Sequence, residues 1–210
     1  MTEKSPIIRG SIFVISAPSG AGKSTLIRDL MAASPGLSFS ISYTTRAPRA
    51  TEKHSEDYFF VSRQAFEGMV RRDEFVEWAE VYGHLYGTAH KQLRAAQEAG
   101  RDILLDIDVQ GHKQVRQQLP EAVSVFILPP SFQELSRRLR DRCSDSAEDI
   151  ERRLQTARNE IAHWPEYDYL VVNDNLKDAT EALRAIVQAA RFRRLNQTGR
   201  AEQITGKFGG

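Results

Sequence analysis

The feature that most constrains this chain is an apolar run that ends in a glycine-rich turn carrying one lysine. The run spans Ile12 to Ser16, and the turn after it reads Ala17-Pro-Ser-Gly-Ala-Gly-Lys-Ser-Thr25. Gly20 and Gly22 can take backbone angles closed to other residues, so the N–H groups of the turn can converge on phosphate oxygens. The next segment has the pattern of a helix, whose N-terminal dipole faces the same anion. The sequence therefore predicts a strand, a phosphate-binding loop and a helix.

Two side chains of this loop suit a nucleoside triphosphate. Lys23 is placed for the β- and γ-phosphates and the Ser24 hydroxyl for Mg²⁺. The strict motif G-x-x-x-x-G-K-[ST] has glycine where Ala17 stands, but the strand before the loop and the helix after it favour the motif over a turn with a chance lysine. We expect the loop to bind ATP through Ala17, Pro18, Ser19, Gly20, Ala21, Gly22, Lys23, Ser24 and Thr25.

Composition excludes several other classes of protein. Lysine and arginine number 29 against 28 acidic residues, which argues against a nucleic-acid binder that relies on overall charge. The one cysteine, Cys143, excludes an internal disulfide, and the five histidines show no metal-ligand spacing. We find neither a signal or transit peptide nor a membrane-spanning run, and expect a cytoplasmic protein with no nucleic-acid or membrane partner.

Strands that alternate with helices along the chain indicate an α/β fold with a parallel sheet and right-handed crossovers. Ser131 and Glu134 have the spacing of a capping box. Residues 196–210 hold four glycines and little apolar content, so we expect a disordered tail. The patterns predict strands at 12–16, 39–43, 57–61, 75–81, 103–108, 122–128 and 169–172, and helices at 63–71, 89–99, 131–142 and 176–195.

Three carboxylates stand out in these strands. Asp106 and Asp108 close an apolar run like a Walker B strand, and period two places both on one face at the carboxyl end, where parallel sheets bind ligands. Glu77 shares a strand face with apolar residues. It is either a buried functional group or the carboxylate of an edge strand that reaches solvent.

Residues 137–158 are dense in arginine, and such a run is most often a solvated helix face. Ser144-Asp-Ser146 interrupts it like a hinge between two helices, which is the layout of a lid that brings guanidinium groups over phosphates.

A phosphate loop alone does not name a reaction, since GTPases, transport ATPases, helicases and small-molecule kinases all use one. Asp108-Val-Gln-Gly111 matches the D-x-x-G of GTPases, but the N-K-x-D guanine signature is absent, and the nearest string, Asn173-Asp-Asn175, lacks the lysine. No L-S-G-G-Q transport signature occurs. A core with a polar insertion and an arginine lid favours a nucleotide or metabolite kinase.

Five separated motifs then resemble the guanylate kinase family, in order, from about Gly10 to Gln188. They are residues 42–49 (Ser-Tyr-Thr-Thr-Arg-Ala-Pro-Arg), 57–58 (Asp-Tyr), 77–79 (Glu-Trp-Ala), 86–88 (Tyr-Gly-Thr) and 106–111 (Asp-Ile-Asp-Val-Gln-Gly). The resemblance implies transfer of a phosphoryl group from MgATP to GMP, giving ADP and GDP. It also implies a phosphate-loop NTPase core at 10–39, 95–128 and 163–195, a mixed GMP-binding subdomain at 40–94 and a helical lid at 129–162.

By resemblance, the guanine is read by Ser42, Glu77 and Thr88 with Asp108 nearby, and the GMP phosphate is held by Arg46, Arg49, Tyr58 and Tyr86. Lys23, Arg138, Arg142 and Arg153 are the implied catalytic residues, and Ser24 and Asp106 the implied Mg²⁺ site, through water. The chemistry agrees: guanine presents N1–H and NH₂ as a donor pair that suits one carboxylate, and an ionised phosphate acceptor needs no general base.

Two rival functions stay open on the sequence. One is a related phosphate-loop kinase with another acceptor, such as a ribose bisphosphate. The other is a guanylate-kinase-like interaction domain that binds phosphopeptides. Tyr43, Asp141 and Cys143 depart from the family pattern, as does Ala17, and a homo-oligomer is possible.

Overall fold

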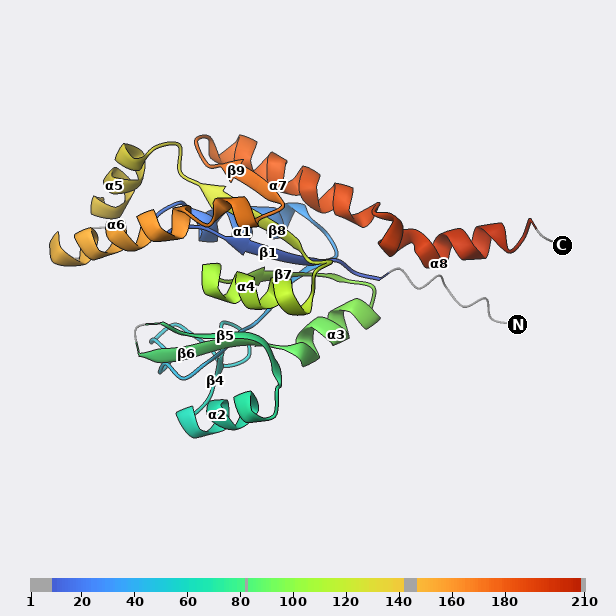
Figure 1. Cartoon of the computed structure of the whole chain (residues 1–210), viewed down its shortest axis with the longest axis horizontal. Helices are drawn as coiled ribbons and strands as arrows, with labels where there is room; N and C mark the ends of the chain where they lie inside the picture. Colours follow the sequence, from blue (N-terminus) through green and yellow to red (C-terminus); the bar gives the residue numbers. More distant parts are fainter. Residues whose placement is uncertain (1–8, 82, 142–146, 209–210) are drawn as a thin grey trace.

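The computed structural model describes residues 9–81, 83–141 and 147–208 (Figure 1). At its centre lies a five-stranded sheet in the order β2-β7-β1-β8-β9, in which every neighbouring pair is parallel. The expected α/β class with a parallel core is confirmed, and the strand before the glycine-rich loop is the middle one. The five strands are β1 (Ile12–Ser16), β2 (Leu37–Phe39), β7 (Asp102–Asp106), β8 (Val123–Leu128) and β9 (Tyr169–Val172).

Helices cover both faces of this sheet (Figure 1). Phe13 and Ile15 of β1 pack towards α1 (Lys23–Ala33) and α7 (Leu176–Arg191). Their neighbours in β1 belong to a second cluster with α3 (His90–Glu98) and α4 (Val109–Gln118). Because successive side chains of a strand point to opposite faces and both faces are buried, the core strands are apolar throughout.

A second, mixed sheet lies below the core in Figure 1 and has the order β4-β3-β6-β5. Helix α2 (Arg63–Arg71) packs on it, with the ring of Phe66 stacked on that of Phe75 at 4.5 Å. To the left of the core in Figure 1, α5 (Phe132–Arg140) and α6 (Ala147–Ile161) share a small apolar cluster, and η1 (Trp164–Glu166) follows them. The strands of the second sheet are β3 (Tyr43–Thr44), β4 (Phe59–Phe60), β5 (Phe75–Val81) and β6 (His84–Ala89).

Some local expectations were wrong. The strand expected at 39–43 is split, because β2 ends at Phe39 in the core sheet and β3 begins at Tyr43 in the other sheet. The strand expected at 103–108 ends at Asp106, and Asp108 caps α4 instead. Neither β6 nor α4 was predicted.

The expected disordered tail is also wrong, because the chain forms helix α8 (Arg194–Thr205) after α7 ends at Arg191. The Asn196 amide is buried and donates to Ser11 Oγ and to the Ala190 carbonyl, both at 2.8 Å. These polar contacts hold the first turn of α8 on the core, so low apolar content did not prevent order. Within the described residues, no helix combines the length and the apolar character needed to span a membrane.

Candidate active site

Two cavities lie at the carboxyl edge of the core sheet and share Lys23. The larger, about 520 Å³, lies between the glycine-rich loop and α6. The smaller, about 180 Å³, lies between the end of β7 and the second sheet. Lys23 and Asp108 line both cavities. Groups bound in the two cavities would therefore meet at the lysine.

The glycine-rich loop has the backbone geometry that its sequence predicts. Gly20 and Gly22 have φ of 90° and 89°, in the left-handed region. Ala17 has no positive φ, so alanine fits there without backbone strain. Ala21 is buried beneath the loop, whereas the other eight predicted residues line the larger cavity: Ala17, Pro18, Ser19, Gly20, Gly22, Lys23, Ser24 and Thr25.

The two aspartates predicted at the sheet edge make different contacts. Asp106, the last residue of β7, lies 2.5 Å from the Lys23 ammonium. The lysine also reaches the Ile107 carbonyl at 3.5 Å. Asp108 accepts a hydrogen bond from the Gly111 N–H at 2.8 Å and so starts α4. Asp106 thus orients the lysine, and Asp108 holds α4 against the cavities.

Glu77 is buried at the wall of the smaller cavity, with 5% of its surface exposed. Its strand β5 lies at the edge of the second sheet, as the solvent-facing alternative requires, but α4 covers that edge. A Cβ placed on Gly111 would lie 2.7 Å from Glu77 Oε2, so the carboxylate lies close against this glycine of α4. The solvent-facing alternative is therefore wrong. The cavity is also lined by the predicted residues Ser42, Tyr58, Tyr86, Asp106 and Asp108, while Thr88 pairs with Glu77 across the strands.

Burial raises the pKa of the Glu77 carboxyl from 4.5 to about 7. The nearby charge of Asp108 adds to this rise in pKa, and the neighbouring Thr88 opposes it. The carboxylate thus has too few donors around it to offset its desolvation. A ligand that supplies two N–H donors would favour the ionised form.

The raised pKa of Glu77 makes the folding stability depend on pH in a defined direction. A carboxyl whose pKa rises on folding stabilises the fold below its unfolded pKa, and that stabilisation is lost as the pH rises through the folded value. The free energy of unfolding of Glu77→Gln should therefore exceed that of the wild type by about 3 kcal/mol at pH 8. This difference should shrink as the pH falls towards 5. Urea unfolding of both proteins at several pH values measures it. The exposed Glu67→Gln serves as control, and a pH-independent difference for Glu77→Gln would contradict the assignment.

The arginines predicted to hold a phosphate monoester lie next to a carboxylate. Arg46 binds both oxygens of Glu52, at 2.8 and 3.0 Å, and its guanidinium lies 5.6 Å from the centre of the Tyr58 ring. Glu52 also accepts the Arg49 backbone N–H at 2.8 Å, and these bonds hold the pKa of Glu52 below its usual range. Neither arginine lines the smaller cavity. Glu52 was not predicted, because one acidic residue in a polar loop carries no sequence signal.

Two of the predicted lid arginines lie within the described residues, and they line different cavities. Arg153 lines the larger cavity with Thr156 and Glu160 of the same helix face. Arg138 lines another cavity of about 380 Å³, which shares Gly20, Gly22 and Thr25 of the loop with the larger one. Arg142, Cys143 and the hinge expected at 144–146 lie outside the described residues.

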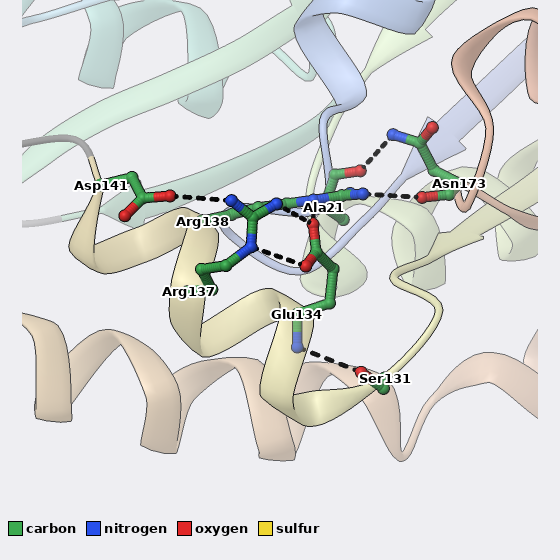
Figure 2. A network of polar contacts seen from close by, with 7 residues as sticks. All are labelled: Ala21, Ser131, Glu134, Arg137, Arg138, Asp141 and Asn173. Atoms are coloured by element: carbon green, nitrogen blue, oxygen red, sulfur yellow. Dashed lines mark hydrogen bonds and ion pairs between the residues drawn. The ribbon is translucent and has the colours of Figure 1, made fainter.

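Arg138 is held in a network that the sequence did not predict (Figure 2). Its Nε donates to Glu134 at 2.7 Å, and its Nη2 to the Asn173 carbonyl at 3.1 Å. Ser131 Oγ accepts the Glu134 N–H at 3.1 Å, which is one of the two hydrogen bonds of the predicted capping box. The Glu134 carboxylate binds Arg137 and Arg138 instead, and they lower its pKa to about 2.

Comparison with known proteins decides between the remaining alternatives. Residues 9–190 match the guanylate kinase family. The guanylate kinase of Koribacter versatilis is 55% identical over 188 residues, which cover 88% of this chain and 81% of that protein. The chain belongs to the guanylate kinase family. The guanylate kinase of Ruegeria pomeroyi is 49% identical over 198 residues, 93% of each chain. The crystal structure of the guanylate kinase from Anaplasma phagocytophilum superposes with a TM-score of 0.72 at 34% identity, over 88% of each chain.

Membership of the guanylate kinase family confirms the resemblance found in the sequence motifs. The individual site residues, the subdomain boundaries and the Mg²⁺ site stay predictions. The sequence did not predict three polar residues of the site: Glu52, which binds Arg46, Asn173, which binds the loop at Ala21, and Glu160, which lines the larger cavity.

Proposed function

We propose that the two cavities beside Lys23 are the substrate sites of the guanylate kinase reaction, in which a phosphoryl group passes from ATP to GMP. The observation that carries this assignment is the buried Glu77 carboxylate in a cavity that also contains Lys23. A guanine base supplies the paired donors that Glu77 needs. Lys23 then lies where a donor in the larger cavity faces the acceptor.

On the donor side, the inward N–H groups of the loop hold the ATP phosphates, and Lys23 supplies a positive charge at the transferred group. Arg153, on the wall of the same cavity, neutralises charge that develops during transfer. We assign the same task to Arg142 from the family pattern. Arg138, the third lid arginine, is assigned the same task and lines a cavity that adjoins the loop.

On the acceptor side, Glu77 accepts from guanine N1–H and NH₂, with Thr88 and Asp108 beside it, while the Ser42 hydroxyl donates to O6. Arg46, Arg49, Tyr58 and Tyr86 hold the GMP phosphate. Arg46 then exchanges its bond with Glu52 for one with the phosphate, since both are oxyanions that suit a planar guanidinium. The phosphate oxygen that attacks is already ionised near neutral pH, so positioning and charge neutralisation carry the reaction.

Mg²⁺ fits this donor set as a partner of ATP. Ser24 lines the larger cavity, and Asp106 offers a carboxylate in the wall of the smaller cavity, beside Lys23. Among the described residues no group of three or more acidic, histidine or cysteine side chains could hold a metal ion alone. This suits Mg²⁺, which keeps several waters and binds through few protein oxygens plus phosphates. When bound, it would neutralise charge on the phosphates.

The experiment that tests the function is ADP release, measured with MgATP and each of four acceptors: GMP, AMP, UMP and a ribose bisphosphate. GMP should give the highest kcat/KM, and AMP about 10⁴-fold less, because AMP would leave the Glu77 carboxylate unpaired. A preference for ribose bisphosphate would support the related kinase. Absence of turnover with every acceptor would support an interaction domain.

A further inference from the structure

The peptide between Ala21 and Gly22 lies at the bend of the phosphate loop. In a trans peptide the C=O and N–H point in opposite directions. An Ala21 carbonyl that points away from the phosphate therefore directs the Gly22 N–H towards it. Gly22 has φ of 89°, and glycine can take φ of either sign, so the loop backbone alone does not prevent this peptide from turning over.

Asn173 contacts the outer side of this peptide. Its side-chain Nδ2 donates to the Ala21 carbonyl at 2.7 Å, and the residue is 5% exposed (Figure 2). A Cβ on Gly22 would lie 2.4 Å from the same Nδ2, so the amide fits closely against the loop. The two partners are 152 residues apart in the chain. The fold therefore brings Asn173, from a distant part of the sequence, against the outer side of the loop.

Asn173 is itself fixed from two other elements. Its N–H donates to the Leu128 carbonyl at the end of β8, at 2.8 Å. Its own carbonyl accepts from Arg138 of α5, which Glu134 holds in place. The amide thus has a defined direction that depends on the core sheet and on the first lid helix. Figure 2 shows the loop, α5 and the end of β9 meeting at this residue.

We propose that Asn173 is a positioning residue that holds the Ala21 carbonyl outward and so keeps the Gly22 N–H directed at the phosphates of the bound nucleotide. This rests on the proposed ATP site in the larger cavity. Asn173 acts on phosphate binding through the loop. It also links the loop to α5, since Arg138 binds the carbonyl of the same residue.

The test measures MgADP binding by calorimetry and competition by inorganic pyrophosphate, in the wild type and in Asn173→Ala and Asn173→Asp. Loss of the donor leaves the Ala21 carbonyl unpaired, and Asn173→Ala should weaken both ligands by about tenfold or more. Asn173→Asp should weaken them further at pH 8, where its carboxylate faces the carbonyl. Its affinity should recover, relative to the wild type, as the pH falls and the introduced carboxyl gains an O–H donor. Pyrophosphate is the probe that separates action through the loop from contact with the base.

Asn196→Asp is the matched control. Asn196 is another buried amide that donates to a backbone carbonyl, far from the loop, and its variant should lose stability but bind both ligands as the wild type does. Unchanged pyrophosphate binding in the Asn173 variants would overturn the inference, as would an equal loss in Asn196→Asp. If Asn173→Asp does not fold, Asn173→Ser replaces it in the same measurements of MgADP and pyrophosphate binding. If Lys23→Met binds MgADP as tightly as the wild type, the proposed ATP site is wrong. This result is distinct from a failure of the positioning role of Asn173.

Discussion

Replacing Lys23 with methionine should lower kcat by about 10³-fold and leave the fold intact. The ammonium lies between the two cavities, 2.5 Å from Asp106, and is the one loop charge that can follow the transferred phosphoryl group. Methionine keeps the length of the side chain and removes only its charge. The loss should therefore fall on turnover and not on the binding of GMP.

The measurement is kcat with saturating MgATP and GMP, with thermal unfolding in parallel. Asp106 keeps about a quarter of its side chain exposed, at 26%, so water can solvate it when the lysine is gone and the melting temperature should change little. Lys113→Met removes an exposed lysine of α4 and should keep wild-type turnover. A Lys23→Met variant with more than a tenth of wild-type kcat would contradict the role given to this lysine.

The sequence predicted those parts of the site that follow directly from a strand. The apolar runs of β1 and β7 end at the loop and at Asp106, and parallel strands bring such ends to one edge. Alternation in β5 placed Glu77 with apolar residues, but could not say what covers it. The cover is α4, whose Gly111 leaves space for the carboxylate, and this helix was not predicted.

The parts that could not be predicted depend on contacts between distant segments. In the sequence, Asn173 stands out only as a poor match to a guanine-binding motif, since nothing near it indicates that it contacts Ala21. Arg138 lies in the same helix as other arginines, and helical spacing did not show that it binds Glu134 and the Asn173 carbonyl. Likewise, alternation at residues 39–43 could not reveal that the segment passes from one sheet to another.

Glu77→Gln should change which acceptor the enzyme prefers. Glutamine keeps the shape of the side chain but replaces one acceptor oxygen with an NH₂ donor, which faces the donors of guanine. GMP should lose about 2 to 3 kcal/mol of charge-assisted bonding, a fall in kcat/KM of about 30- to 150-fold. AMP has an acceptor at N1 and only hydrogen at C2, so its low kcat/KM should change little.

Whether Glu77 in the cavity beside Lys23 reads the guanine of GMP is measured by kcat/KM for GMP and for AMP in the wild type and in Glu77→Gln. Glu67→Gln, an exposed residue of the same subdomain, controls for charge alone, and thermal unfolding confirms that the variants are folded. If Glu77 reads the guanine, the GMP to AMP ratio of kcat/KM should fall by about 30-fold or more in Glu77→Gln and stay unchanged in Glu67→Gln. An unchanged GMP to AMP ratio in Glu77→Gln would contradict this role of Glu77.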